Sequence, residues 1–184
     1  MKDEQDPQPT AEAPEPLDVM RKAYQDAEFH FDEDEGTLSL RLGLKNLDVT
    51  VISWGHANDV ASIIVRLPIR ATEEFRARTG EFLHRLNYAA KRKFWEMDYS
   101  DGEIRLVAYT DTITGPLTEG LFRSIFHAVT CTADVTFPYL TSVLSGRMSP
   151  EFAADQAEAA IEAFWDKGET VDDAEEEPPE PNEQ

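Results

Sequence analysis

The chain has 184 residues, of which 37 are acidic and 17 are basic, and its formal net charge at pH 7 is -20. This length is enough for one domain with a substantial hydrophobic core. A charge this negative repels phosphate backbones, so duplex nucleic acid is an unfavourable partner unless the domain carries a concentrated basic face.

The two ends of the chain are acidic and rich in proline. Residues 1–18 contain six acidic residues against one basic residue, and residues 166–184 contain nine against one. Segments with so much charge and so few apolar residues cannot bury enough surface to offset the entropy of ordering. The sequence therefore predicts disordered acidic tails at 1–16 and 167–184 around a single domain at 17–166.

The first half of this domain predicts a short helix, three strands and a second helix. Apolar residues recur at helical spacing from Leu17 to Ala27, and an acidic turn is expected at 32–36. Alternating apolar residues then predict strands at 38–44, 47–54 and 61–70. Thr72 is expected to cap the next helix, and Gly80 weakens the middle of that helix.

The second half predicts a hairpin followed by two helices. Strands at 93–99 and 103–110 flank a turn at 100–102, with Trp95 facing Leu106 across the pair. Thr118 caps a long apolar helix, which must kink or stop at Pro138, and a kinked continuation is favoured. Ser149 and the proline after it begin a last helix that ends near residue 167.

The order of predicted elements is therefore α-β-β-β-α-β-β-α-α. Hairpin-length connections within each group of strands predict a mainly antiparallel sheet of about five strands. Because the strands alternate apolar and polar residues, the helices are expected on one face of this sheet, which makes the fold α+β.

One pair of reactive residue types occurs at helical spacing. His127 and Cys131 stand four residues apart, so their side chains can meet, and a thiolate-imidazole pair is in principle a nucleophile. Asp134 could line the same cleft. Cys131 also lies beside the apolar residues Phe126 and Val129, and free cysteines are often buried as small hydrophobic residues. We favour packing and predict no catalytic residue, with a Cys/His-dependent enzyme as an alternative.

The sequence predicts neither a metal site nor a cofactor site. No histidine pairs at metal-ligand spacing with a second histidine or cysteine; the four are His30, His56, His84 and His127. Asp32, Asp34 and Gly36 look like the start of a calcium loop, but such a loop needs glycine and glutamate where Thr37 and Gly43 stand. Phosphate-binding glycine loops and the hydrolase nucleophile motif are absent.

The segment from Arg66 to Arg105 interleaves nine basic residues with aromatic ones, as a single-stranded nucleic-acid site would. The same segment contains seven acidic residues, and a nucleic-acid surface needs a concentrated positive field. A solvated surface of mixed charge is therefore the favoured interpretation, and single-stranded nucleic-acid binding is kept as an alternative.

Several short motifs make the chain similar to the YbjN family, a bacterial group also labelled sensory transduction regulators. The similarity is carried by Leu86–Tyr88, Phe94–Asp98, Gly102–Arg105, Leu121–Leu140 and Gly146–Pro150. The resemblance implies an α+β fold like that of type III secretion chaperones. It also implies a domain that forms homodimers and holds other polypeptides, and it transfers no active site.

These observations together predict a non-enzymatic bacterial cytoplasmic adaptor or chaperone-like regulator that binds a protein or peptide client. Trp54 and Trp95 are the candidate partner-binding residues, with core packing as the other interpretation of each. Asn87 is expected at a helix end or turn, and Asp134 as a local partner of a backbone group. With the single cysteine Cys131 and no membrane-length apolar run, we expect no disulfide, no membrane contact and a cytoplasmic location.

Overall fold

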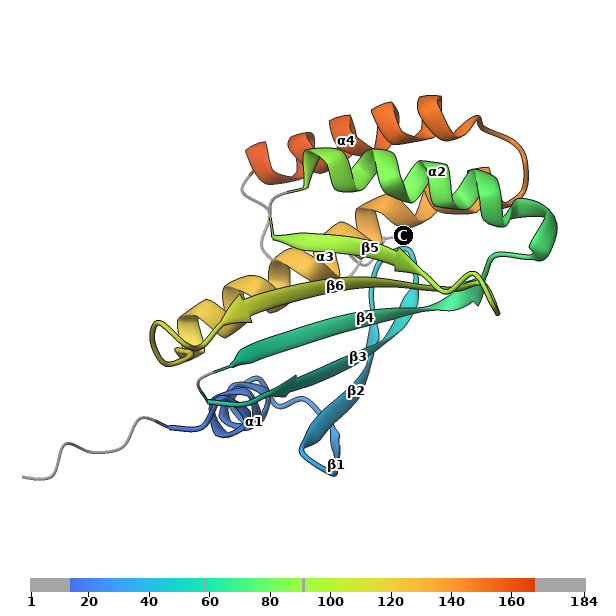
Figure 1. The fold of residues 1–184 in the computed structure, drawn as a ribbon. Coiled ribbons are helices and arrows are strands. Elements are labelled where there is room, and N and C mark those ends of the chain that lie inside the picture. Colours follow the sequence, from blue (N-terminus) through green and yellow to red (C-terminus); the bar gives the residue numbers. More distant parts are fainter. Residues whose placement is uncertain (1–13, 58, 91, 168–184) are drawn as a thin grey trace, which may run out of the picture.

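The structure, a computed structural model, describes residues 14–57, 59–90 and 92–167 (Figure 1). Its helices are α1 (Pro16–Asp26), α2 (Glu73–Ala89), α3 (Glu119–Leu144) and α4 (Pro150–Asp166). Its strands are β1 (Asp32–Asp34), β2 (Thr37–Gly43), β3 (Asp48–Gly55), β4 (Val60–Arg70), β5 (Lys93–Met97) and β6 (Glu103–Asp111). The predicted acidic tails fall mostly at 1–13 and 168–184, outside the described residues.

The strands form one antiparallel sheet in the order β1-β2-β3-β4-β6-β5. The α+β class is confirmed, but the described sheet has six strands where the sequence predicted about five. The extra strand is β1, which lies in the expected acidic turn and pairs Asp34 with Thr37. Its turn residues Glu35 and Gly36 both have positive φ, as a two-residue hairpin requires. All three β1 residues are exposed, so no apolar alternation indicated a strand.

One face of the sheet carries the hydrophobic core. In β3 every second residue is buried, including Val51 and Ser53, and the hydroxyl of Tyr24 from α1 lies 2.6 Å from the Ser53 hydroxyl. Tyr24 also packs edge-on against Phe122 and Phe126 of α3, with ring centroids 5.4 and 5.5 Å away. Helices α1 and α3 therefore cover the same face of the sheet.

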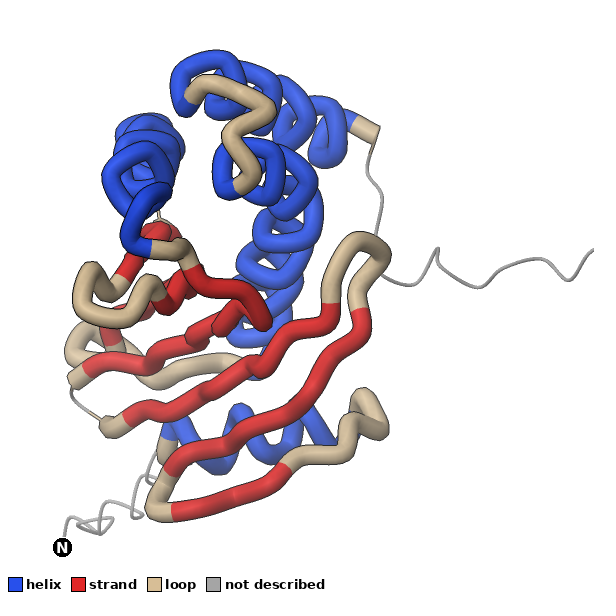
Figure 2. The backbone as a smooth tube through the Cα atoms, turned by 90° about the vertical axis from the view of Figure 1, so that its right-hand side faces the viewer, coloured by secondary structure: helices blue, strands red, loops and turns tan. Residues whose placement is uncertain are grey.

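Helices α2 and α4 lie at the end of the sheet where β5 is the edge strand (Figures 1 and 2). Helix α2 contacts β5. Helix α4 packs mainly on α2 and α3, not on the strands. Buried alanines on α4 allow this close packing; they are Ala153, Ala154 and Ala157. In the part of the chain that is described, no helix has both the length and the apolar character that crossing a membrane requires.

Helix α3 continues through Pro138 to Leu144, so the helix does not stop at this proline. Proline has no N–H to donate to the carbonyl oxygen of Asp134, four residues earlier. The side-chain amide of Asn46, in the turn between β2 and β3, donates to that oxygen at 3.2 Å. The Asp134 carboxylate in turn accepts the backbone N–H of Asn46 at 2.7 Å. A tertiary contact thus supplies the hydrogen bond that the helix lacks. Asp134 does bind a backbone group, but this group lies 88 residues away in the sequence and is not the local one that was predicted.

Candidate functional site

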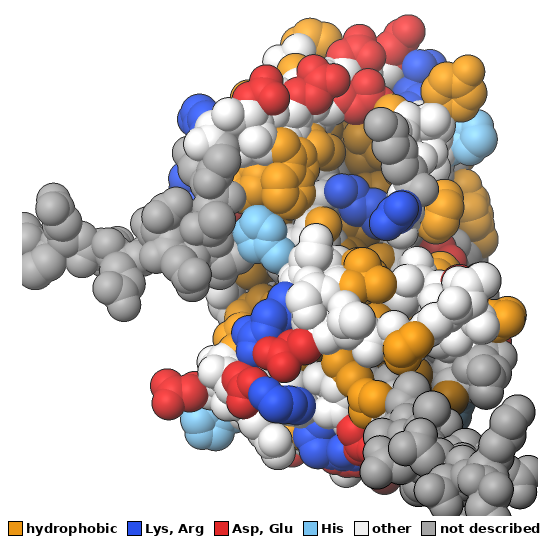
Figure 3. Space-filling view, turned by 90° about the vertical axis from the view of Figure 1, so that its left-hand side faces the viewer, with side chains coloured by type: hydrophobic (Ala, Val, Ile, Leu, Met, Phe, Trp, Pro, Cys, Tyr) orange, Lys and Arg blue, Asp and Glu red, His pale blue; other side chains and the backbone are white. Residues whose placement is uncertain are grey.

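An open cleft of about 580 Å³ lies between α2, β5, α3 and α4. Most of its lining is apolar and includes Ala89, Trp95, Ala128 and Trp165. The polar and charged residues that line it include Arg92, Lys93, Thr132, Glu158 and Glu162. Figure 3 shows the opening as a hydrophobic hollow beneath an acidic ridge, with basic side chains beside it. Concave, mainly apolar sites of this size are typical of binding sites in proteins.

The position of β5 in the cleft wall depends on Asn87, near the end of α2. Its amide donates to the carbonyl oxygen of Trp95 at 2.8 Å, and its amide oxygen accepts the Trp95 N–H at 2.7 Å. The asparagine side chain therefore bonds to the free edge of β5 as a neighbouring strand would. Asn87 lies in the last turn of α2, as predicted, but its link to the sheet edge was not foreseen.

Trp95 and Trp54, the predicted partner-binding residues, lie on opposite faces of the sheet. Trp95 is 5% exposed and belongs to the core that forms the floor of the cleft. Trp54 is half-buried on the other face, with its ring 6.0 Å from that of His56. The structure does not bring the two side chains together, and only Trp95 takes part in the cleft.

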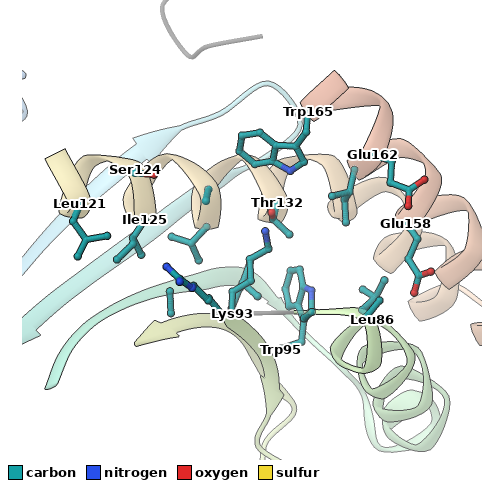
Figure 4. A pocket seen from close by; sticks show the side chains of 18 residues that line it. Leu86, Lys93, Trp95, Leu121, Ser124, Ile125, Thr132, Glu158, Glu162 and Trp165 are labelled. Atoms are coloured by element: carbon teal, nitrogen blue, oxygen red, sulfur yellow. The ribbon is translucent and has the colours of Figure 1, made fainter. Parts of the chain in front are cut away.

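Lys93 begins β5 and extends into the cleft between Trp95 and Trp165, with its ammonium directed toward Thr132 (Figure 4). The Nζ atom lies 5.8 Å from the centre of the Trp165 ring, at cation-π distance. Burial lowers the pKa of Lys93. Within the described residues, no carboxylate pairs with this ammonium.

Thr132 of α3 is the second polar group in the floor of the cleft. Its side chain is 3% exposed, and its Oγ1 has no hydrogen-bond partner in the part of the chain that is described. A buried hydroxyl without a partner is costly, as is a desolvated ammonium. Lys93 and Thr132, which Figure 4 shows facing each other, are therefore two hydrogen-bond donors that the described part of the chain leaves unused.

The mouth of the cleft carries charges of opposite sign. Glu158 and Glu162 project from α4 (Figure 4), and Arg92, directly before β5, also lines the cleft. These residues give the cleft a negative rim and a positive rim around an apolar floor.

Each of the three residues of the alternative enzyme hypothesis has its own surroundings in the described part of the chain. The Asp134 carboxylate is engaged by Asn46, and His127 packs its ring 5.5 Å from Trp165. Cys131 is buried, and burial raises the pKa of its thiol to about 11. A thiol with this pKa is protonated at neutral pH, whereas the thiolate is the nucleophile.

Many of the basic residues between 66 and 105 have hydrogen-bond or ion-pair partners within the described part of the chain. Several are held by local acidic groups or carbonyl oxygens, namely Arg70, Arg76, Arg78, Arg85 and Arg105. Lys93 points into the cleft, and Lys91 lies outside the described residues. Pairing of this kind weakens the concentrated positive field on which binding to single-stranded nucleic acid depends. No group of three or more metal-ligating side chains gathers in the described part of the chain.

Sequence analysis did not single out Lys93, Thr132 or Trp165. A signal was present for Lys93, because strand alternation places it on the same side as Trp95, and a lysine on the apolar face of a strand is unusual. Thr132 and Trp165 come from two different helices, so their approach to Lys93 depends on how α3 and α4 pack.

The comparisons with known proteins concern the fold. The crystal structure of YbjN from E. coli is similar to this structure, with a TM-score of 0.45 and 11% sequence identity. The similarity covers 84% of this chain and 95% of that chain. No family model matches the sequence, and no curated protein matches it. Membership of the YbjN family therefore stays a prediction, and we take no function from this likeness.

Proposed function

We propose that this protein is a non-enzymatic adaptor that binds an amphipathic helical segment of another polypeptide in the cleft between α2, β5, α3 and α4. The observation that carries the proposal is the cleft itself, about 580 Å³ of mainly apolar space open to solvent. An amphipathic helix buries its apolar face in such a groove and leaves its polar face in water.

The two charged rims support a helical occupant. A helix lying in the cleft presents one flank to Glu158 and Glu162 and the other flank to Arg92. Basic residues on the first flank and acidic residues on the second would pair with the rims and fix the orientation of the helix. The expected partner segment therefore has an apolar face between a basic flank and an acidic flank.

The edges of the sheet make binding of an extended strand less favourable. On β5, the edge groups of Trp95 are already occupied by Asn87. On β1, three consecutive acidic residues face solvent, and charged residues on a short edge strand discourage pairing with another chain. A segment that binds by its side chains in a groove suits this surface better than one that binds by its backbone.

The non-enzymatic part of the proposal is supported by the state of the candidate nucleophile. Cys131 is buried with a raised pKa, and the carboxylate of Asp134 holds the turn between β2 and β3.

We also propose that the protein is cytoplasmic and forms a homodimer. Sedimentation equilibrium of the full chain would measure its mass, and a monomeric mass would remove the dimer from the proposal.

The proposal is tested by filling the cleft. Ala128 on α3 and Ala89 on α2 line it from two different helices, so Ala128→Trp and Ala89→Trp would each occupy it. Ala159 is exposed on α4 and does not line the cleft, so Ala159→Trp is the matched control. A library of displayed helical peptides is selected against the full wild-type protein, and the affinities of the enriched peptides are measured on all variants.

We expect both cleft variants to weaken peptide binding by about 100-fold, the effect of losing several buried apolar contacts, and the control to bind normally. Circular dichroism of each variant shows whether it is folded. If folded Ala89→Trp protein keeps wild-type affinity, or if no helical peptide is enriched, the proposal is wrong.

A further inference from the structure

We infer that Lys93 and Thr132 form a carboxylate-binding site in the floor of the cleft, which accepts one acidic side chain from the apolar face of the bound helix. This inference rests on the proposed function and specifies the chemistry of the partner. The partner segment would carry an aspartate or glutamate among its apolar anchors, a position where acidic residues are rare.

The first support is the position of Lys93. Lys93 is half-buried, and its side chain extends between Trp95 and Trp165 toward Thr132, whereas most lysines point away from the protein (Figure 4). The Trp165 ring lies 5.8 Å from Nζ and makes a cation-π contact with one side of the ammonium. A lysine ammonium has three donors, so donors remain for an incoming acceptor.

The second support is independent of the first and comes from Thr132. Its hydroxyl is buried in the floor of the cleft, and within the described residues it makes no hydrogen bond. Threonine hydroxyls in helices often donate to the carbonyl four residues earlier, as Thr130 does to Phe126 at 2.8 Å. Because Thr132 makes no such bond, its donor would be free to bind an acceptor that enters beside Lys93.

The charges around the site select a carboxylate over other groups. A carboxylate offers two acceptor oxygens, which match the ammonium and the hydroxyl, and its single charge matches that of Lys93. A phosphate would bring more charge close to Glu158 and Glu162, which also line the cleft. An ammonium or guanidinium group would be repelled by Lys93 itself.

A side chain suits the site better than a free alkyl carboxylate. The cleft is also lined by Glu158, Glu162 and Arg92, and an alkyl chain would leave these charged groups without a partner. A helix that places one acidic side chain on Lys93 still presents polar flanks to Glu158 and Arg92. The peptide is therefore the occupant that uses all of these groups.

The test compares acidic and neutral peptides on matched lysine variants of the full chain. Peptides enriched on the wild-type protein are measured with their glutamate or aspartate and with glutamine or asparagine in its place. The protein variants are Lys93→Met, Thr132→Val and the control Lys45→Met, which removes an exposed lysine from the turn between β2 and β3. Decanoate is tested as a competitor at the same time.

We expect neutralising the peptide side chain to weaken its binding to wild-type protein by about 10- to 100-fold, the usual effect of losing a charge-assisted hydrogen bond. Lys93→Met protein should bind the acidic and neutral peptides equally, and Thr132→Val protein should lose part of the preference. Lys45→Met protein should discriminate as the wild-type protein does.

The outcomes separate this inference from the proposed function. Peptides that need the open cleft but show no acidic preference would overturn the carboxylate site and leave the adaptor proposal standing. Peptides indifferent to Ala89→Trp would overturn both. Decanoate binding at micromolar concentration that depends on Lys93, with no peptide enriched, would show that the site takes a free carboxylic acid and that the inferred partner is wrong.

Discussion

Two glycines show how differently the same residue type can be constrained in this fold. Gly102, in the turn between β5 and β6, has a φ of +78°, and a Cβ there would lie 2.0 Å from the carbonyl oxygen of Ala71. Its own carbonyl accepts the Ala71 N–H at 2.8 Å, so the two backbones are held together. Gly80, in α2, has ordinary helical φ, and a Cβ there would clash with the phenol end of the exposed Tyr99 and touch the Met97 methyl group at an ordinary 3.6 Å.

We therefore predict opposite results for the same substitution at these two positions. Gly102→Ala should lower the free energy of unfolding by about 2 kcal/mol or more, because both the positive φ and the contact with Ala71 are incompatible with a side chain. Gly80→Ala should change it by less than about 1 kcal/mol, because the gain in helix propensity offsets the movement of Tyr99. Urea unfolding of both variants tests this, and equal destabilisation would contradict it.

Lys93 lies in the protein at a cost to stability, which is typical of residues retained for binding. Its ammonium is desolvated, and burial is the cause that lowers its pKa. A group with this shift favours the unfolded state while it is charged. Functional sites often contain such destabilising groups, and removing them raises stability while reducing activity.

We predict that Lys93→Met stabilises the protein by on the order of 1 kcal/mol at about pH 7. As pH rises through the lowered pKa of folded Lys93, the unfolded chain still holds its proton, so wild-type stability increases relative to the variant. The advantage of Lys93→Met should thus shrink by about pH 10 as the ordinary lysine pKa is approached.

The measurement is urea unfolding of both proteins across this pH range, with Lys45→Met as the control. Lys45 is exposed, so the difference between the control and wild type should stay constant with pH. A stabilisation by Lys93→Met that is the same at every pH would mean that the desolvated charge is not its cause.

At the scale of elements, helix α3 depends on a residue far from it in the sequence. Pro138 removes one hydrogen bond from the helix, and Asn46 supplies a donor to the Asp134 carbonyl in its place. The same asparagine donates its side-chain and backbone N–H groups to the Asp134 carboxylate. These hydrogen bonds therefore connect the turn between β2 and β3 to the middle of α3.

A double-mutant cycle tests this link. Asn46→Ala should lower the free energy of unfolding by about 1 to 2 kcal/mol, because it removes hydrogen bonds to Asp134. Pro138→Ala restores an N–H to the helix and should raise it by roughly 1 to 3 kcal/mol, and Pro138 is exposed, so no cavity forms. In the Pro138→Ala background the cost of Asn46→Ala should fall by about 0.5 kcal/mol or more. Strict additivity would show that Asn46 does not serve the carbonyl that the proline leaves free.

Helices and strands could be predicted where a residue pattern repeats along the chain. They could not be predicted where one tertiary contact determines whether an element forms or continues. Leucine alternation indicated β2, and Thr118 and Ser149 cap α3 and α4 by accepting from Leu121 and Phe152, as expected. β1 was missed because its acidic residues carry no alternation. The continuation of α3 past Pro138 depends on Asn46, which no local pattern around the proline contains.

At the scale of the whole molecule, the cleft could not be predicted because it forms where four elements meet. Sequence periodicity assigned Trp95 to a strand and Thr132 to a helix, but not the distance between those elements. Local spacing drew attention to His127 and Cys131 because they share one helix. The structure instead joins Lys93, Thr132 and Trp165, which come from β5, α3 and α4.

The net charge of -20 affects this cleft through long-range electrostatics. Helix α4 ends at Asp166, directly after the cleft residue Trp165, and eight acidic residues follow Lys167 in the chain: Glu169, Asp172, Asp173, Glu175, Glu176, Glu177, Glu180 and Glu183. Negative charge attached to the rim repels a segment that brings its own carboxylate to Lys93. Such repulsion slows association and is screened by salt, with a Debye length of about 8 Å at physiological ionic strength.

We therefore predict that replacing those eight acidic residues by asparagine and glutamine speeds the association of an acidic helical peptide. The association rate constant should rise by about 10-fold at low salt and by less than about 2-fold at 1 M salt, because long-range steering acts on the rate of encounter. The dissociation rate constant should not change at either concentration. Stopped-flow fluorescence with a labelled peptide measures both constants, and the neutral version of the peptide is the control, since it should gain less. A change in the dissociation rate that persists at 1 M salt would contradict long-range repulsion, because it would mean that this acidic segment contacts the cleft or the bound peptide directly.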